Sequence, residues 1–537
     1  MSNPLRTWAE IFPACNRILA PADWSRLVGE PAAAEQWASL PALIRTRSAE
    51  LELPPYLEEL AALEAAIETG RELDGQLPDR VTKKILNPSL RILHFNWQGL
   101  TKALEPAGGR DFAPLAGEET VLVWFDPRRG QVRAQPASDQ ILLALKITAE
   151  ELPIGPTALK HGVAVASLHR VVEQARGKGL VLAPESLLAR DPARFTVQEK
   201  AFARFLKPRV FTLQWHITQA CDLNCKHCYD RSSRPDLSLA QALRVLDQLE
   251  SFCESRQVRG KVTFTGGNPL LYPHFDALYR ETVRRGFPVS ILGNPTSRQR
   301  LEELVAIQAP SFYQVSLEGL PEHNDLVRQA GYFDRVLAFL PHLRELGIPS
   351  QVMLTLTRDN LAQVLPLGEI LRGQTDLFTF NRLSAVGEGA QLLMPSPAEY
   401  QDFLREYLRE VGNNPVLGLK DNLINIIRAE EGSKPFGGCT GFGCGAGFNF
   451  ATLLSDGEVH ACRKFPSYLG NIYQEGLAGA YDSPAGQRYR AGSAACRGCR
   501  QLPACGGCQA VIYSLGLDPA KDRDPYCFYA QAPGPGS

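Results

Sequence analysis

Residues 221–228 read Cys-Asp-Leu-Asn-Cys-Lys-His-Cys, a dense group of possible metal ligands in one short stretch. Cys221, Cys225 and Cys228 have C-x3-C-x2-C spacing, which lets a single loop place three thiolates on three irons of a cubane cluster. The fourth iron then has no ligand from this loop. Because a structural cluster or zinc site is normally closed by a fourth protein ligand, the open position indicates that a substrate or cofactor binds there.

Two other interpretations of these cysteines are open at this point. His227 could complete a zinc site with the three thiolates, and closely spaced cysteines in secreted proteins often form disulfides. The residues before the loop favour a catalytic role. Residues 211–218, FTLQWHIT, form a strand-like run that ends at the loop, and α/β barrels carry their chemistry at the carboxyl ends of strands.

The composition is that of an ordinary globular protein, and the length of 537 residues allows three or four domains. With 57 basic and 58 acidic residues, no overall charge attracts nucleic acid or an anionic membrane. The sequence contains no apolar run of about 18 residues, and the start MSNPLRTWAEIFP lacks the apolar core of a signal peptide. We therefore expect a cytoplasmic protein.

The thirteen cysteines are strongly clustered. Outside the loop, Cys15 and Cys253 stand alone and are expected to be small core residues. The others lie near the end of the chain, at Cys439, Cys444, Cys462, Cys496, Cys499, Cys505, Cys508 and Cys527. Spaced groups of cysteines in a cytoplasmic chain indicate metal binding.

After the loop, helical patterns alternate with short apolar runs. The further strand candidates are residues 261–265, 288–292, 313–317, 351–357 and 377–383. With the strand before the loop they make six strands with intervening helices, which predicts a parallel sheet with right-handed crossovers.

The cysteine loop, including the ring of His227 before its last cysteine, resembles the signature loop of radical S-adenosylmethionine (SAM) enzymes. This resemblance implies an α/β fold, a partial (β/α)6 TIM barrel over residues 205–400. It also implies a catalytic [4Fe-4S] cluster on Cys221, Cys225 and Cys228. In that family the open iron chelates the methionine part of SAM, and an electron from the cluster cleaves SAM to a 5′-deoxyadenosyl radical.

The turn Thr265-Gly266-Gly267-Asn268-Pro269 follows the second predicted strand. Glycines at a strand end let the backbone approach a ligand closely, although a Gly-Gly pair is often only a tight turn. In this position the turn resembles the family's GGE motif, which implies that Gly266 and Gly267 bind SAM. Asn268 stands where the family usually has Glu, so a role for that carboxylate is in doubt.

The segment QVSLEGLPEHNDLVRQAGYFDRVL resembles a family segment in which a strand ends in Ser-Leu-Asp-Gly. By that resemblance Ser316 and Glu318 contact SAM, and Arg328 binds its carboxylate through paired charged hydrogen bonds. A solvated loop residue is the alternative for each, and it is favoured for Glu318. Asn381, Arg382 and Leu383 resemble, more loosely, a family feature that faces the active site.

The eight tail cysteines are enough for two four-ligand sites. Two C-x2-C pairs, Cys496 with Cys499 and Cys505 with Cys508, could instead hold one zinc ion. The tail resembles the SPASM extension of peptide-modifying radical SAM enzymes, because Gly457 and Cys462 match its G-x4-C element and C-x2-C-x5-C matches its core. One departure is that two residues, not three, separate Cys505 from Cys508.

The SPASM resemblance implies two auxiliary [4Fe-4S] clusters within residues 401–537. Their ligands interleave in fully ligated members of the family. One cluster would be held by Cys439, Cys444, Cys462 and Cys508. The other would be held by Cys496, Cys499, Cys505 and Cys527.

The front third divides into helical residues 1–80 and a second region, residues 81–195. In the second region, strands at 92–97, 120–125 and 131–134 precede helices at 138–152, 155–162 and 166–178. This order resembles the winged helix-turn-helix of PQQ-chaperone-like leader-recognition domains, which bind a precursor peptide as an added strand. A structural domain and a DNA-binding domain are the alternatives, but the basic charge near residues 161–178 is thin.

Together these patterns predict an oxygen-sensitive maturase of a ribosomally made peptide. Its partners would be the precursor peptide and a low-potential electron donor, with no membrane or nucleic acid. The stretch QACDLNCKHCYDRS is similar to maturases paired with selenobiotic-type peptides. The alternatives are an anaerobic sulfatase-maturase-like enzyme that oxidises a Cys or Ser in a protein, and a zinc-stabilised winged-helix DNA-binding regulator.

Overall fold

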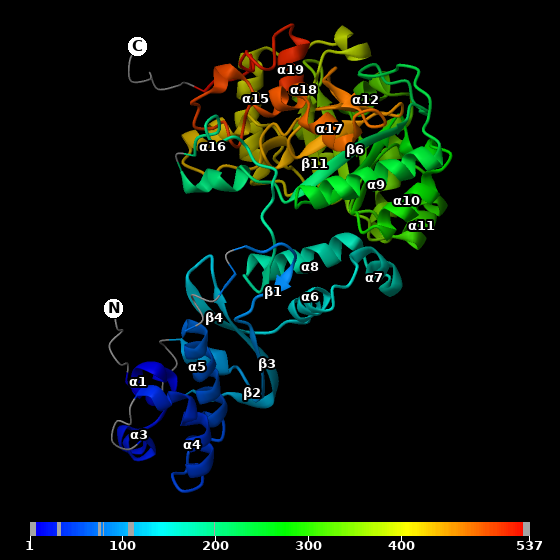
Figure 1. Ribbon diagram of the computed structural model, residues 1–537. Coiled ribbons are helices and arrows are strands. Elements are labelled where there is room, and N and C mark those ends of the chain that lie inside the picture. Colours follow the sequence, from blue (N-terminus) through cyan, green and yellow to red (C-terminus); the bar gives the residue numbers. More distant parts are fainter. Residues whose placement is uncertain are drawn as a thin grey trace. The chain divides into compact units, whose positions relative to one another are not determined.

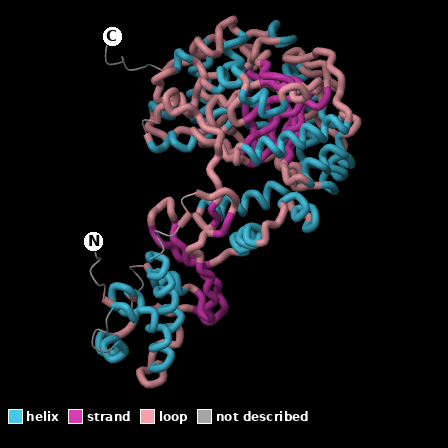
Figure 2. The backbone as a smooth tube through the Cα atoms, viewed as in Figure 1, coloured by secondary structure: helices cyan, strands magenta, loops and turns pink. Residues whose placement is uncertain are grey.

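The structure is a computed structural model that describes residues 7–28, 34–72, 77–78, 80–105, 112–197 and 199–529. The chain forms two compact units. The first comprises Met1–Ile154 with Ser167–Pro184, and the second comprises Gly155–Ala166 with Glu185–Ser537. Figure 1 shows the elements of each unit, and Figure 2 separates helices from strands.

The first unit combines a small sheet with a layer of helices. Its strands β2 (Arg91–Gln98), β3 (Leu115–Asp126) and β4 (Gln131–Pro136) are antiparallel in the order β2-β3-β4. The helices before them are α1 (Trp8–Ile11), α2 (Pro13–Ile18), α3 (Pro21–Val28), α4 (Leu40–Arg47) and α5 (Leu57–Glu72). Helix α5 packs on all three strands, so residues before and after position 80 share one hydrophobic core.

The predicted strands and helices of residues 92–182 are present. After the sheet come α6 (Asp139–Ala149), α7 (Ile154–His161) and α8 (Val165–Gly177). The short strand β5 (Val181–Leu182) then pairs antiparallel with β1 (Ile85–Leu86). Most of α7 belongs to the second unit, where Gly155 lies so close to Arg284 that an added Cβ would be 2.1 Å from its carbonyl oxygen.

The second unit is built on six parallel strands that are adjacent in chain order, as the sequence predicts (Figure 1). They are β6 (Val210–Thr218), β7 (Arg259–Gly266), β8 (Val289–Leu292), β9 (Tyr313–Ser316), β10 (Ser350–Leu356) and β11 (Leu377–Arg382). The helices between them are α9 (Leu239–Ser255), α10 (Phe275–Arg284), α11 (Arg298–Ile307), α12 (Pro321–Val327), α13 (Tyr332–Glu345) and α14 (Val364–Ile370). Local signals set the helix starts: Ser238 and Gln241 form a capping box on α9.

The tail continues the same sheet. Strand β12 (Phe450–Leu453) pairs parallel with β6, and β13 (Glu458–His460) and β14 (Tyr468–Asn471) follow antiparallel. The remaining helices are α15 (Pro397–Val411), α16 (Ile424–Glu430), α17 (Gly476–Asp482), α18 (Pro484–Arg490) and α19 (Gln509–Ser514). The cysteine-rich tail is therefore joined through β12 to the strand that precedes the cysteine loop.

The two isolated cysteines are core residues, as expected. Cys15 and Cys253 are buried. No helix in the described part of the chain combines the length and apolarity needed to span a bilayer.

A buried carboxylate fixes the first helices of the front unit, and its removal should loosen them. Glu64 of α5 is 3% exposed and accepts hydrogen bonds from the amides of Ala14 (2.7 Å) and Cys15 (3.0 Å). Glu64→Ala leaves two buried donors without an acceptor, which costs roughly 1–3 kcal/mol. In native-state hydrogen exchange the amides of α2 should lose protection accordingly.

The control is Glu58→Ala on the same helix, which removes only a surface ion pair with Arg45. Equal exchange of α2 in both variants would contradict this role of Glu64.

Candidate functional site

The three cysteines of the loop face one cavity at the carboxyl ends of the parallel strands. Cys221, Cys225 and Cys228 line this cavity of about 380 Å³, which we call the upper cavity. The loop is held by a hydrogen bond from the Lys226 amide to the Val327 carbonyl (2.9 Å). Burial raises the pKa of the Cys221 and Cys225 thiols.

The glycine turn packs directly on the backbone that leads into the loop. An added Cβ would lie 2.3 Å from the Thr218 carbonyl oxygen at Gly266 and 2.3 Å from the Ala220 carbonyl oxygen at Gly267. The Gly267 amide donates to Thr218 (3.0 Å), and the next amide donates to Ala220 (2.7 Å). Both glycines line the upper cavity, and only glycine allows this approach.

The departure at Asn268 has a local physical reason. Its side-chain amide donates to the carboxylate of Asp222 (3.0 Å), and Asn294 donates to the same oxygen (2.6 Å). A glutamate at position 268 would place a second carboxylate beside Asp222. The Asn294 amide also lies 3.8 Å from the Cys221 sulfur. Asp222 and Asn294 were not predicted as site residues, and no motif in the sequence marks them.

Glu318 is a buried partner of Arg328. The Glu318 side chain is 1% exposed, so the solvated-loop interpretation is wrong. It accepts from Arg328 Nε (3.0 Å) and from the Thr355 amide (2.8 Å), and it lies 3.4 Å from His227 Nε2. Burial acts to raise the pKa of Glu318, but His227 and Arg328 outweigh it and the pKa is lowered.

Ser316 and Arg328 line the upper cavity, and Glu318 lies behind them. The Arg328 guanidinium is 3.7 Å from the Cys225 sulfur. Glu318 thus holds an arginine against the cysteine loop and satisfies part of its hydrogen-bonding capacity. Burial lowers the pKa of His227, which also lines this cavity.

Asn381, Arg382 and Leu383 at the end of β11 also line the upper cavity. The Arg382 side chain is 4% exposed. It pairs with one carboxylate before the cysteine-rich tail and one within it. It donates to Asp421 (2.9 Å) and forms a fork with Asp524 (2.9 and 2.7 Å). Such a buried set of charges is stable only when it is complete, so Arg382 fixes the tail against the sheet.

The tail cysteines form two groups. Cys439, Cys444, Cys462 and Cys508 line a second cavity of about 260 Å³, which we call the lower cavity. Cys496, Cys499, Cys505 and Cys527 line a third, separate and smaller one. The upper and lower cavities share wall residues, among them Met353, Asn381 and Lys464.

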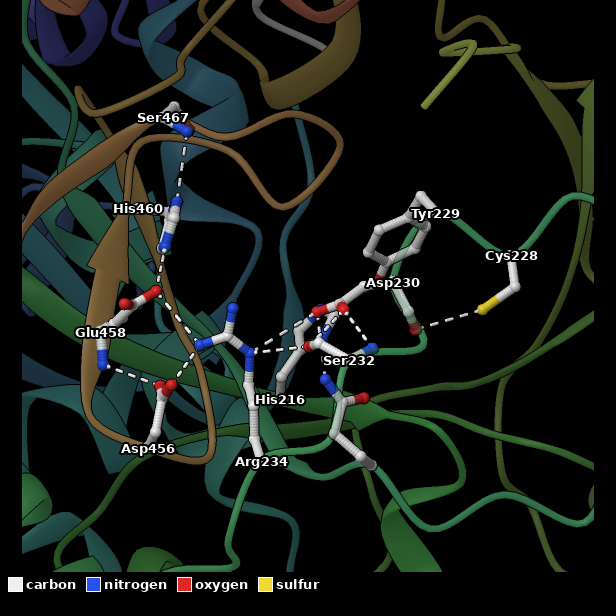
Figure 3. A network of polar contacts seen from close by, with 11 residues as sticks. His216, Cys228, Tyr229, Asp230, Ser232, Arg234, Asp456, Glu458, His460 and Ser467 are labelled. Carbon is white, nitrogen blue, oxygen red and sulfur yellow. Dashed lines mark hydrogen bonds and ion pairs between the residues drawn. The ribbon is translucent and has the colours of Figure 1, made fainter. Parts of the chain in front are cut away.

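A chain of polar contacts connects the cysteine loop to the tail (Figure 3). The Cys228 thiol lies 3.3 Å from the Asp230 carbonyl oxygen, and Arg234 lies 3.9 Å from the Asp230 carboxylate. Arg234 also binds Asp456 and donates to Glu458 (3.1 Å). Sequence reasoning missed these residues because they are acidic and basic side chains far apart in the chain.

The chain continues from Glu458 to a tail cysteine. His460 Nε2 lies 3.0 Å from Glu458, and His460 Nδ1 accepts from the Ser467 amide (3.2 Å), which defines a tautomer protonated at Nε2. The Ser467 hydroxyl accepts from the Cys462 amide (3.0 Å). Cys228 and Cys462 are therefore linked by a continuous series of side-chain and backbone contacts.

A separate buried pair borders the loop. The Tyr229 hydroxyl and His216 Nε2 are 2.9 Å apart, and both residues line the upper cavity. Burial lowers the pKa of His216 to about 3 and raises that of Tyr229 to about 12. Both groups are neutral at physiological pH.

The donor sets fit iron–sulfur clusters. No three His, Cys, Asp or Glu side chains within the described ranges converge closely enough to hold one metal ion. Zinc ligands sit about 2.3 Å from a single ion, whereas cubane ligands surround a larger body. The three loop thiols and two sets of four tail thiols suit three such clusters.

Comparison with known proteins agrees. Residues 215–368 match the radical SAM superfamily, and residues 444–509 match the SPASM iron-sulfur cluster-binding domain. The chain is therefore a radical SAM enzyme with a SPASM domain. Its cofactors are SAM, a catalytic [4Fe-4S] cluster and auxiliary clusters.

Several characterised proteins are similar. An AdoMet-dependent heme synthase of Methanosarcina barkeri is 26% identical over 341 residues, which cover 59% of this chain and 96% of that protein. The mycofactocin maturase MftC of Mycobacterium ulcerans is 29% identical over 341 residues, which cover 59% of this chain and 87% of that protein. The structure of Streptococcus suis SuiB bound to precursor peptide SuiA covers 76% of this chain and 96% of that one, at 16% identity and a TM-score of 0.49.

Loss of Arg234 should uncouple the loop from the tail. In Arg234→Met, the carboxylates of Asp230, Asp456 and Glu458 lose their shared cation. We expect amide exchange in residues 228–236 and 456–463 to become about tenfold faster, which corresponds to about 1.4 kcal/mol. Arg234→Lys should restore part of the protection.

Arg298→Met is the control, because Arg298 pairs with two exposed carboxylates on the surface. If Arg234→Met speeds exchange only in residues 228–236 and not in residues 456–463, the contact chain does not couple the loop to the tail.

Proposed function

We propose that this enzyme modifies a ribosomally synthesised precursor peptide by hydrogen abstraction. The observation that carries the proposal is the three-thiol loop in a cavity whose walls continue into a second, thiol-lined cavity. The similarity to mycofactocin maturase supports a peptide as the substrate class. The outcome on the peptide is a crosslink, a thioether or a heterocycle.

The loop residues have distinct tasks in this proposal. With SAM bound, the catalytic cluster supplies the 5′-deoxyadenosyl radical that takes the hydrogen atom. Cys221, Cys225 and Cys228 hold that cluster. Gly266, Gly267, Ser316 and Arg328 bind SAM, with His227 beside them, and Glu318 acts by orienting Arg328.

The two groups of tail cysteines hold the auxiliary clusters. The grouping by cavity supports one cluster on Cys439, Cys444, Cys462 and Cys508 and another on Cys496, Cys499, Cys505 and Cys527. Each cluster then has four protein ligands, which suits electron transfer or substrate positioning better than direct ligation of substrate.

The front unit recognises the leader of the precursor. Its three-stranded sheet has edges at β2 and β4, and an extended peptide can add to such an edge through main-chain hydrogen bonds. The strands and helices over residues 81–195 support a winged-helix domain of the PQQ-chaperone-like type. Residues 205–400 form the partial TIM barrel, and residues 401–537 the linker helices and SPASM domain.

A low-potential electron donor reduces the catalytic cluster. The enzyme works in the cytoplasm, because eleven iron-binding thiolates need a reducing, disulfide-poor compartment. The interpretation as a zinc-stabilised DNA-binding regulator is wrong, since the radical SAM and SPASM matches make the chain an enzyme.

Replacement of the three loop cysteines should remove one cluster and the chemistry. Anaerobically reconstituted protein should hold about twelve irons, four per cluster. The variant with Cys221, Cys225 and Cys228 changed to Ala should hold about eight and release no 5′-deoxyadenosine from SAM.

Cys253→Ala is the matched control, because this thiol is a buried residue of α9 and lies outside all three cysteine groups. It should leave iron content and SAM cleavage unchanged. Release of 5′-deoxyadenosine by the triple variant, or two to three zinc ions in place of iron, would refute the assignment.

Binding of the precursor should protect the front unit from hydrogen exchange. The probes are the products of any short reading frames beside this gene, added to the full-length protein. We expect slower exchange in one edge strand, β2 or β4, because an added strand covers its free amides and carbonyls. Protection confined to residues 205–527 would contradict leader recognition and favour the sulfatase-maturase-like alternative.

A further inference from the structure

The inner face of the parallel sheet is polar, which is unusual for strands of this kind. Along β6, the residues Phe211, Leu213 and Trp215 are buried apolar side chains on one face. On the other face, Thr212 and Gln214 line the lower cavity. Strands of parallel sheets are normally apolar on both faces, and barrel interiors are normally filled by branched apolar residues. Here the sequence keeps the interior open and polar.

Four of the polar side chains in the lower cavity have no hydrogen-bond partner. Gln214, Gln314 and Gln351 project from β6, β9 and β10, and Lys261 projects from β7. Within the described residues, none of these side chains forms a hydrogen bond or ion pair with another group of the chain. These side chains face the cavity, so their polar groups are available to a molecule that enters it.

The charge of the lower cavity favours an anionic group. Asp421 is the single carboxylate among the described residues that line it, and Arg382 already binds Asp421 at 2.9 Å. Lys261 lies with its ammonium group 4.7 Å from the centre of the Phe312 ring and has no carboxylate partner in the described part of the chain. An ammonium group that faces a cavity without a carboxylate partner can attract an anionic group that enters the cavity.

Lys261 is also distinct from the cations that serve the thiols. The thiols of Cys508, Cys439 and Cys462 act to raise the pKa of Lys464. Burial outweighs them, and the pKa is lowered. For Lys261, burial is the cause of the lowered pKa. Lys261 and the three glutamines belong to the part of the cavity wall that the strands contribute, whereas the thiols come from the tail.

We propose that this part of the lower cavity binds a carboxylate of the peptide substrate. Lys261 supplies the cation, and Gln214, Gln314 and Gln351 supply amides that can hydrogen-bond the peptide groups beside the carboxylate. The inference rests on the proposed function and specifies its substrate: a peptide with a carboxylate close to the residue that reacts. That carboxylate belongs either to an acidic side chain or to the peptide's C-terminus.

The shared walls of the two cavities make this placement chemically useful. Gln314 lines both cavities and comes from the strand that ends at Ser316. A peptide held by its carboxylate at Lys261 can therefore extend along β9 toward the upper cavity. Binding of the carboxylate at Lys261 would position the reacting atom of the peptide, although the carboxylate itself takes no part in the reaction.

The test measures binding without turnover. Full-length protein is reconstituted anaerobically, and SAM is added. The probes are N-acetyl-Gly-Gly-Glu-Gly-Gly-amide, N-acetyl-pentaglycine with a free C-terminal carboxylate, and N-acetyl-pentaglycine amide. Calorimetric titration should show at least one carboxylate probe binding about tenfold more tightly than the amide, as expected for one charge-assisted contact.

The Lys261→Met variant should lose that preference while keeping its iron content and its cleavage of SAM. The control Lys207→Met, which removes an exposed lysine paired with Glu185, should keep it. Preference for the glutamate probe identifies an acidic side chain, and preference for the free-acid probe identifies the C-terminus. No preference in the unsubstituted protein, or an undiminished preference in Lys261→Met, overturns the proposal.

The two proposals fail in different ways. Because the binding preference is measured on unreacted probes, its absence says nothing against peptide modification. Conversely, the protein could prefer carboxylate probes and yet cleave no SAM. That result would support the binding site in the lower cavity and refute the proposed reaction.

Discussion

The close approach of two backbones at the ends of β6 and β7 is the constraint on which the catalytic cavity depends. Gly266 and Gly267 lie against the carbonyls of Thr218 and Ala220, with no room for a side chain. Two amide hydrogen bonds join the segments. Because Cys221 follows directly, the direction in which the loop leaves β6 is set by this contact. The thiols can then share one cavity with side chains from the six parallel strands.

Charged side chains connect the loop and β11 to the tail. Arg234 bridges Asp230 to Asp456 and Glu458, and Arg382 bridges Asp421 to Asp524. A buried charge that loses its partner is strongly destabilising. Such contacts therefore favour one arrangement of the tail over near alternatives. That suits an enzyme in which thiol groups from segments far apart in the sequence must surround preformed clusters.

The sequence was most informative where a pattern repeats or a spacing is fixed. The six parallel strands follow from apolar runs separated by helical periods, and the cysteine groups follow from spacing. The role of Glu318 could not be predicted, because its burial and its pairing with Arg328 depend on how helix α12, which lies between them, returns the chain to the end of β9. The role of Asn268 could not be predicted either, because the group that accepts its hydrogen bond, Asp222, is 46 residues away. Likewise, the association of α7 with the second unit depends on a close contact of Gly155 with Arg284 that no local pattern encodes.

The polar inner face of the sheet was visible in the alternation of FTLQWHIT, yet it could be recognised only with the sheet assembled. Taken alone, Thr212 and Gln214 are compatible with a solvent-exposed strand face. Only the parallel neighbours on both sides of β6 show that this face points inward.

Burial of the thiols ties the assembly of the tail to its metal. Burial raises the pKa of Cys444 to about 12 and those of Cys462 and Cys496 to about 11. These thiols stay protonated at neutral pH as long as they hold no iron, whereas iron–sulfur clusters bind thiolates. Cluster insertion must therefore release protons, and acid must oppose it. Burial of these thiols therefore carries a cost of deprotonation that the binding of iron must offset.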